Sequence, residues 1–447
     1  MTVTAAAPPA AQSGAPARAA RPTPRRPGLR GAFEGTPGGL RAVALVAVLA
    51  SLAFAVLGAL AFQDRAEALG QARADAAQLV RVQEISIELV RADAAATNAF
   101  LSAGVGLPPA EQLRVYDESL ATAARRIADA ARAQPADAPA LALVNADLAL
   151  YSARVTTALQ TKRTSQTLGT GYLNLASNTL LRQGMLPRLD TVVAADARRV
   201  DDAFAASERA GTMLLASGVA VVLVMVGGAV WMARRTRRVV NVPLTGATAA
   251  VALTLVVGGL VMVSTQSRAR EVRDTEYAAT RALAEARIAA SRAKGDEAVT
   301  LIRQNFTLKK NGETLTFVDP GAATIAAAQS RITAAVRSGY AGDADPLLAQ
   351  WKRVHEQVIA AVNDNDVARA VDVATGPTGK QGSSNAAFAA FDAAVERDLR
   401  DGSQAVADGL GGPGPLLLLL GLAALVIGLL AAAASWLGVS QRLEEYR

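Results

Sequence analysis

Four long runs without a charged residue constrain this 447-residue chain more than any other feature. They cover residues 42–62, 212–233, 243–266 and 415–437. A helix of about 21 residues, rising ~1.5 Å per residue, is about 31 Å long and matches the hydrocarbon thickness of a bilayer. Uncharged runs of this length are rare inside soluble folds. The sequence therefore predicts four transmembrane helices rather than four buried core helices.

The charges beside these spans predict their orientation. Six arginines and one acid precede the first span, within residues 1–41. The link at 234–242 contains four arginines and no acid: Arg234, Arg235, Arg237 and Arg238. Cytoplasmic loops carry an excess of positive charge. We therefore expect a multi-pass plasma-membrane protein whose termini and link are cytoplasmic, with residues 63–211 and 267–414 outside.

The net charge of +7 follows from the same distribution. The link arginines lie next to a span, so we interpret them as a topology signal that contacts anionic lipid headgroups, and we expect no nucleic-acid partner. Trp231 and Trp436 lie at the predicted cytoplasmic ends of the second and fourth spans, where indole rings favour the interface.

The two long segments between spans have nearly equal lengths, 149 and 148 residues. Arg126–Arg132 aligns with Arg331–Arg337 at an offset of 205 residues, and Arg91 aligns with Arg292 at an offset of 201. Similar offsets within segments of equal length indicate a tandem repeat. Both copies have the same predicted orientation, so the repeat is parallel, unlike the inverted halves of many transporters.

Each segment has the pattern of helices separated by breakers. In the first segment the breakers are Gly104–Pro109, Pro135–Pro139 and Thr164–Gly171, and the last helix continues through Pro187 into the second span. Four helices with short links form an up-down-up-down bundle. The expected fold is an all-α membrane protein with four transmembrane helices and two tandem extracytoplasmic four-helix bundles.

Two stretches depart from this plan. Residues 307–317 alternate in character around Asn311–Gly312, which predicts a small β-hairpin in the second segment. Asn311, Gly312 and Phe317 are candidates for a partner-binding tip, and loop decoration is the alternative. Residues 1–38, rich in Ala, Pro, Gly and Arg, predict a disordered cytoplasmic tail, and residues 438–447 form a second cytoplasmic tail.

Catalytic and metal-binding patterns are absent from the sequence. It contains no cysteine, one histidine (His355) and no phosphate-loop, zinc-protease or serine-hydrolase motif. We expect neither enzymatic activity nor a cofactor or metal. His355 follows Trp351 by one helical turn, which is typical of packing residues, with a small site as the alternative. Arg91 and Arg292 are candidates to hold a carboxylate ligand, and solvated arginines are the alternative.

The predicted cytoplasmic pieces are too short to hold an enzyme, whereas nearly 300 residues lie outside. The helices before and after the first segment continue into their spans, so a small slide or rotation at the outer end would reach the cytoplasmic side. Gly411–Pro415 interrupts the helix before the fourth span. We expect that span to be uncoupled or hinged.

Two span–bundle–span units, a Pro/Ala/Arg-rich tail and the Arg126–Arg132 motif with its echo at Arg331–Arg337 resemble the GlnX-type actinobacterial membrane sensors. The external segments also resemble the four-helix-bundle sensor domains of chemoreceptors. The GlnX resemblance implies two partners. A solute-binding lipoprotein loaded with aspartate or glutamate would dock outside, and the Ser/Thr protein kinase G inside would adjust glutamate and 2-oxoglutarate metabolism.

Three functions remain open on this basis. The first is a non-enzymatic signal transducer. The second is an envelope scaffold or accessory subunit of a transporter. The third is a direct small-molecule sensor. The sequence leaves open the ligand, self-association and the direction of helix motion.

Overall fold

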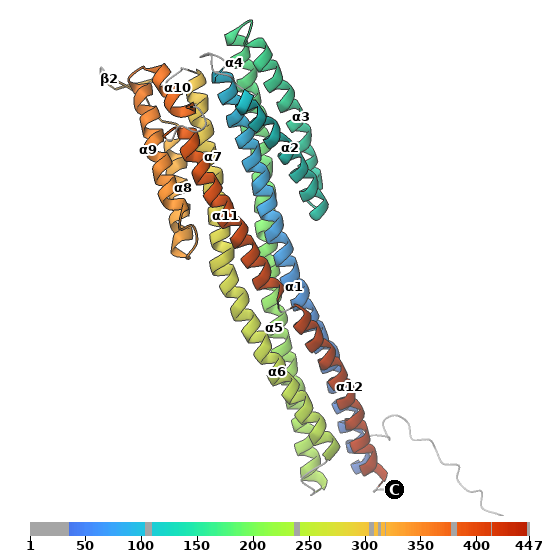
Figure 1. Cartoon of the computed structure of the whole chain (residues 1–447). Coiled ribbons are helices and arrows are strands. Elements are labelled where there is room, and N and C mark those ends of the chain that lie inside the picture. The colour runs from blue at the N-terminus through green and yellow to red at the C-terminus, as the bar shows by residue number, and fades with distance from the viewer. Residues whose placement is uncertain are drawn as a thin grey trace, which may run out of the picture.

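The computed structural model describes residues 35–102, 110–236, 242–303, 308–311, 314–317, 319–376, 382–412 and 414–444. Four helical runs are long and apolar enough to cross a membrane: Arg41–Leu101, Gln166–Arg234, Val242–Leu301 and Ser384–Ser440. Each contains one of the four uncharged segments. The chain is a helical membrane protein, elongated along its spans (Figure 1).

Three spans continue beyond the membrane as unbroken helical runs. Their elements are α1 (Gly35–Ser102); α4 (Gln166–Asn174), the π-helix η2 (Leu175–Met185) and α5 (Leu186–Thr236); and α6 (Val242–Val272), the π-helix η3 (Arg273–Tyr277) and α7 (Ala278–Arg303). Pro187 lacks the amide hydrogen that an α-helix requires, and the wider turns of η2 end just before it. The predicted continuity through Pro187 is confirmed.

The fourth span has a different junction. α11 (Ser384–Gly411) ends at the first glycine of the Gly-Gly-Pro-Gly stretch, and α12 (Gly414–Glu444) begins at its last glycine. This interruption is the one that the sequence predicts. Gly412 still has helical backbone angles and donates its N–H to the Asp408 carbonyl oxygen. The proline that follows it in the sequence lacks the amide hydrogen that a continuing helix requires.

The remaining elements lie at the end of the molecule away from the spans, which we call the distal end (Figure 1). They are α2 (Ala110–Ala133), α3 (Ala138–Thr161), β1 (Leu308–Asn311), β2 (Thr314–Phe317), α8 (Ala322–Arg337), α9 (Ala344–Asn363) and α10 (Val367–Thr375). Residues 63–211 are called the first module and residues 267–414 the second module below.

Each module has an apolar core of its own. Leu89, Ile127, Leu148 and Tyr151 belong to the first core, which draws on α1, α2, α3, η2 and α5. Trp351 and Phe391 are the largest side chains of the second core, which draws on α7, α8, α9 and α11. In α2 the buried residues recur every three or four positions, so one face packs inward.

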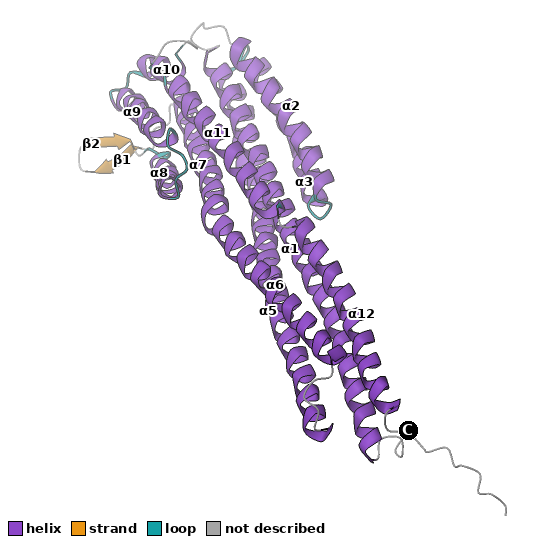
Figure 2. Cartoon of the chain, turned by 60° about the horizontal axis from the view of Figure 1, so that its bottom comes forward, coloured by secondary structure: helices purple, strands orange, loops and turns teal. Residues whose placement is uncertain are grey.

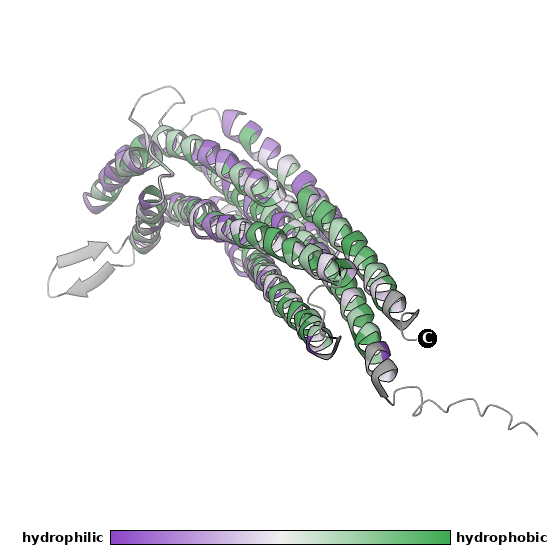
Figure 3. Ribbon diagram, turned by 90° about the horizontal axis from the view of Figure 1, so that it is seen from below, coloured by the Kyte–Doolittle hydropathy of each residue, from purple (hydrophilic) through white to green (hydrophobic). Residues whose placement is uncertain are grey.

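The spans pack through small residues and expose large apolar ones. Leu223, Leu253, Leu419 and Leu430 are each more than 60% exposed, as expected for side chains that face lipid. Hydrophobic residues are concentrated along the helices at this end (Figure 3). A Cβ atom on Gly428 would lie 2.5 Å from the Cβ atom of Ala55, so α12 approaches α1 closely.

The predicted small-residue contacts at Gly227–Gly228 and Gly258–Gly259 are only partly borne out. A Cβ atom on Gly228, Gly258 or Gly259 would contact a neighbouring helix, but one on Gly227 would meet nothing within 4 Å. Ala44, Met232, Leu244 and Val439 share one apolar cluster. The start of α1, the end of α5, the start of α6 and the end of α12 therefore lie at one end of the molecule.

Two local predictions need adjustment. β1 and β2 form the expected antiparallel hairpin beside α8 and α9 (Figure 2), but Asn311 pairs with Thr314, so the turn lies one residue later than predicted. Gly169 and Gly171 were predicted to break a helix, yet both lie inside α4. The break falls at residues 162–165, and Gly169 allows α4 to approach Lys162 and the Ala158 carbonyl oxygen.

Candidate functional site

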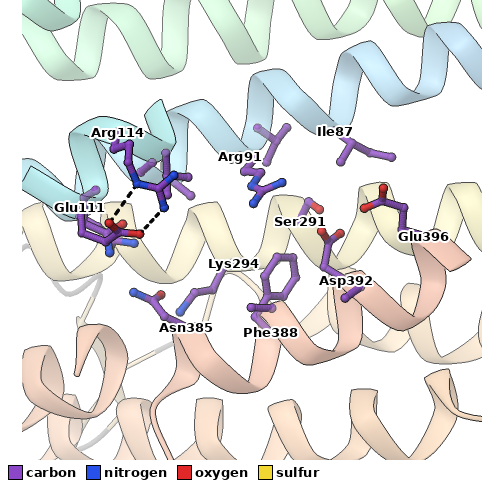
Figure 4. A pocket seen from close by; sticks show the side chains of 18 residues that line it. Ile87, Arg91, Glu111, Arg114, Ser291, Lys294, Asn385, Phe388, Asp392 and Glu396 are labelled. Carbon is purple, nitrogen blue, oxygen red and sulfur yellow. Dashed lines mark hydrogen bonds and ion pairs between the residues drawn. The ribbon is translucent and has the colours of Figure 1, made fainter. Parts of the chain in front are cut away.

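A cleft of about 370 Å³ lies between the two modules near the distal end (Figure 4). Its walls come from α1 and α2 of the first module and from α7 and α11 of the second. Ile87, Val90, Val115 and Phe388 give it an apolar lining. A pocket of this size and composition suits a small organic molecule.

Most charged groups of the cleft are paired within the protein. Arg114 binds Glu111 and Glu118 at 2.6 Å each. Asp392 accepts two hydrogen bonds from the buried Arg287, at 2.5 and 2.9 Å, and Glu396 accepts one from Arg287 and one from Arg400. These pairs neutralise both acids on the α11 wall, so neither is available to attract a cation strongly.

Arg91 is the exception among the described lining residues. Its guanidinium lies at the cleft on α1, exposed, with no ion pair or hydrogen bond to any described residue. Burial raises the pKa of the neighbouring Glu88 carboxyl, and the positive charge of Arg91 partly opposes that rise. The cleft thus offers one uncommitted positive charge.

A buried polar network lies behind the second wall of the cleft. Lys294, which lines the cleft, donates to Glu297 Oε1 at 2.5 Å and to Ser384 Oγ at 2.8 Å. Trp351 Nε1 also donates to Ser384 Oγ, at 3.1 Å, and Ser384 donates to Glu297 Oε2 at 3.0 Å. The network joins α7, α9 and α11, so the cleft wall is tied to the core of the second module.

His355 completes this network with both ring nitrogens. Nδ1 lies 2.6 Å from Glu297 Oε2, and Nε2 lies 3.0 Å from Asp319 Oδ2. Ionised carboxylates only accept hydrogen bonds, so both nitrogens must carry a proton and the ring is an imidazolium. Burial opposes this charge, but the hydrogen bonds to Asp319 and Glu297 raise the pKa of His355 to about 9.

Glu297, at the centre of the network, is correspondingly ionised. Burial favours the neutral form, yet Lys294 and His355 lower the pKa of Glu297 to about 2. Two cations and two carboxylates therefore balance inside the second module. A balanced and fully hydrogen-bonded set is the form in which buried charges are tolerated.

The first module also contains a buried polar network, which is smaller than that of the second module. Asp93 on α1 is buried and accepts hydrogen bonds from Tyr151 on α3, at 3.0 Å, and from Ser177 on η2, at 2.5 Å. Asp93 lies 201 residues before Lys294, the same offset that relates Arg91 to Arg292. In both modules a buried charged group on the first helix is thus bound to a serine of the last helical run.

A second charged cluster lies where the α2–α3 turn meets α1 and α5. Arg199 forms ion pairs with three aspartates: Asp75, Asp137 and Asp196. Burial and the charge of Asp137, opposed by Arg199, raise the pKa of Asp196 to about 7. One guanidinium cannot fully neutralise three carboxylates, so Asp196 is the group that takes up a proton near neutral pH.

Ion pairs also connect the last helical run of the first module to the first run of the second. The pairs are Arg182–Asp296, Asp190–Arg292, Asp201–Arg273 and Glu208–Arg270. Residue numbers rise along one partner as they fall along the other, as antiparallel neighbours require. Exposed pairs of this kind contribute roughly 0.2–1 kcal/mol each, so their main effect is to set the register of the two helices.

The structure separates the two arginines that the sequence paired as ligand candidates. Arg91 lines the cleft, whereas Arg292 binds Asp190 of the first module at 3.0 Å and does not line it. A carboxylate ligand for either residue stays a prediction. Both belong to the contact between modules, which the sequence did not reveal.

The remaining sequence candidates are not among the residues that line the cleft. Trp231, Trp436 and Arg234 are exposed at the ends of α5 and α12, which is compatible with an interfacial position. Arg237, Arg238 and Gly312 lie outside the described residues, and the side chains of Arg235, Asn311 and Phe317 do as well. The lipid contact of the arginines and the partner-binding tip stay predictions.

Comparison with known proteins identifies the first module. Residues 68–205 match the model of a family described as Actinobacterial sensor domain. The match runs from α1 through α2, α3, α4 and η2 into α5, so it covers most of the first module, including Arg91 and the Asp196 cluster. The first module is therefore similar to this sensor-domain family, and its first and last helical runs are long and apolar enough to cross a membrane. No curated protein and no solved structure matches it.

Sequence reasoning missed the buried networks. His355 was expected to be a packing residue, but its partners Glu297 and Asp319 are 58 and 36 positions away. The available signal was Lys294-x-x-Glu297 on the apolar side of a helix, where unpaired charges are rare. That spacing places both side chains on one face of α7.

Proposed function

We propose that this chain is a non-enzymatic signal transducer that relays an extracytoplasmic state through the membrane to a cytoplasmic partner. The sensor-domain match supports a sensing role. One observation supports the proposed relay most directly. α1 contributes to the first core and to the inter-module cleft, and the same unbroken helix forms the first span. A displacement of α1 at the cleft must therefore reach the opposite end of the helix.

The second component of the relay is the registered pair formed by the α4–α5 run and the α6–α7 run. Four ion pairs along their contact resist sliding of one helix past the other. We therefore expect these two helices, and with them the second and third spans, to move together. The fourth span follows a break after Gly411 and is the least directly coupled of the four.

The two modules are, in this proposal, tandem four-helix bundles. Arg126 on α2 forms an ion pair with Glu84 on α1, and Arg331 on α8 forms one with Glu285 on α7. The offsets are 205 residues for the arginines and 201 for the glutamates, the same two offsets that the sequence matches show. Equivalent ion pairs on equivalent helices support duplication of an ancestral module.

The resemblance to GlnX-type sensors supplies the finer form of the proposal. A lipoprotein loaded with aspartate or glutamate would dock on the modules, and a cytoplasmic Ser/Thr kinase that controls glutamate and 2-oxoglutarate metabolism would receive the signal. A sensor-domain family is compatible with this role. Envelope scaffold or transporter accessory subunit is the competing function, and affinity purification from membranes separates them: a kinase partner supports the relay, and a permease partner supports the scaffold.

The relay itself is tested by interrupting the helix. Two glycines inserted after Gly70 add flexible backbone to α1 between the cleft and the first span. The matched control is the same insertion after Gly412, where the helix is already broken. We expect the first insertion to abolish ligand-dependent kinase output and the second to preserve it, with equal amounts of protein in the membrane. Equal output from the two variants would contradict transmission through α1.

The cleft favours a second mode of sensing, in which a small molecule binds the chain directly. The lining described above has an uncommitted guanidinium and an apolar wall between two modules.

A further inference from the structure

We propose that the inter-module cleft binds a small organic carboxylate with an apolar body, and that Arg91 holds the carboxylate. This inference deepens the sensing role proposed above and depends on that role for its signalling consequence. The binding step itself stands on the lining of the cleft.

The charges that line the cleft favour a negatively charged ligand. Arg114 and Lys294 are paired with glutamates, and Asp392 and Glu396 are paired with arginines. Among the described lining residues, Arg91 alone carries a charge that makes no ion pair or hydrogen bond to a described residue, although it interacts through space with Glu88. A guanidinium binds carboxylate oxygens through two parallel N–H groups, which is stronger and more directional than a contact with a neutral group.

Buried polar side chains in the same cleft also lack partners. Asn98 is 6% exposed and Ser291 is 5% exposed, both line the cleft, and neither makes a side-chain hydrogen bond to a described residue. Buried polar groups are almost always hydrogen-bonded, to the protein, to water or to a ligand. They come from α1 and α7, the helices on opposite sides of the cleft, so a ligand that satisfies both must bridge the two modules.

The apolar part of the lining selects the body of the ligand. Val90, Val115 and Phe388 line the cleft together with several alanines. Figure 4 shows Phe388 on the α11 wall, across the cleft from Arg91 on α1. A carboxylate at Arg91 would therefore extend its hydrocarbon part toward the Phe388 ring. A simple inorganic anion could bind Arg91 but would make no apolar contact with the rest of the lining.

Binding would join the modules at a defined place. Arg91 belongs to the helix that forms the first span, and the facing wall is anchored through Lys294 to the His355 network. A bridging ligand would draw α1 toward α7 and α11. The second module is internally braced by that network, so α1 is the element expected to shift.

Binding is tested on the purified full-length chain in detergent. The probes are phenylacetate and 3-methylbutanoate, each compared by calorimetry with its neutral amide. We expect each carboxylate to bind at least tenfold more tightly than its amide. Arg91→Gln should weaken carboxylate binding at least tenfold, Arg91→Lys should weaken it less, and the exposed Arg125→Gln on α2 should leave it unchanged. Thermal unfolding of each variant verifies that the fold is retained.

Two results would overturn the site: neither carboxylate binds the wild-type chain at millimolar concentration, or Arg91→Gln binds them as the wild type does. The sensing role fails separately. If a carboxylate binds through Arg91 but probe-to-probe distances at the membrane ends of α1 and α5 stay unchanged, the site is retained and direct sensing is contradicted.

Discussion

Two carboxylates hold the ring of His355 from opposite sides, so the only histidine of the chain is a fixed cation rather than a pH sensor. Its pKa of about 9 lies well above the ordinary value of 6.5. Stability from a group with a raised pKa is fully present below the unfolded value and is lost as pH rises through the folded value. The loss here falls between pH 6.5 and 9, a window that includes neutral pH.

Replacing His355 should remove this contribution. At pH 6.5, His355→Gln should lower the free energy of unfolding by roughly 3 kcal/mol, from ~1.4 kcal/mol per pKa unit. The difference from wild type should shrink as pH rises from 6.5 to 9. Chemical denaturation in detergent at several pH values measures it, with the exposed Lys352→Gln on the same helix as control. A difference that does not change with pH would contradict the imidazolium assignment.

Asp196 is the residue that should titrate near neutrality. Its pKa is raised from 3.8 to about 7, so the native state holds the proton and the associated stability is lost as pH rises from about 4 through 7. Asp196→Asn keeps the side chain neutral. At pH 8 the variant should be more stable than wild type by roughly 2 kcal/mol, a figure reduced to allow for the partly solvated Arg199. Near pH 4 the two should be equal.

Thermal unfolding across this pH range is the measurement. The control is Asp202→Asn, an exposed neighbour on the same helix. If Asp196→Asn is less stable than wild type at pH 8, the ion pair with Arg199 outweighs the cost of burial, and the raised pKa of Asp196 is contradicted.

At the scale of elements, close helix packing depends on a few glycines. A Cβ atom on Gly428 of α12 would lie 2.5 Å from Ala55 Cβ and 2.8 Å from Ala55 Cα on α1. Overpacking of this kind costs roughly 1–3 kcal/mol. Gly428→Ala should therefore lower the melting temperature in detergent by several degrees. Gly246→Ala on α6, where a Cβ atom meets nothing within 4 Å, should change it little. Equal melting temperatures would mean that α1 and α12 are not in this contact.

The sequence predicts elements well where local chemistry decides them. The uncharged runs, the Gly411–Pro415 break and the β-hairpin are local signals, and the structure bears them out. Gly169 was misread because its role is to admit a neighbouring backbone, which only the packed structure reveals. The cleft is still harder to predict from the sequence. Its walls combine residues near 90, 112, 292 and 390, and no local pattern indicates that α1 lies beside α7 and α11.

For the whole molecule, the repeat in the sequence does not show how the two modules contact each other. Arg91 and Arg292 occupy matching positions, yet one faces an open cleft and the other binds Asp190. Two modules side by side in a parallel repeat present different faces to each other. Equivalent residues therefore acquire different surroundings, and a site at the contact belongs to neither module alone.

The orientation of the molecule in the membrane decides whether this contact meets the outside. The chain has no cysteine, so single-cysteine variants report on one position each. Thr156→Cys on α3 and Lys352→Cys on α9 are exposed positions in the two modules, and Arg234→Cys is exposed at the opposite end. From the positive-inside rule we expect a membrane-impermeant maleimide to label the first two in intact cells. It should label Arg234→Cys only after the membrane is opened. The reverse pattern would place the cleft in the cytoplasm, where neither an external lipoprotein nor an external carboxylate could reach it.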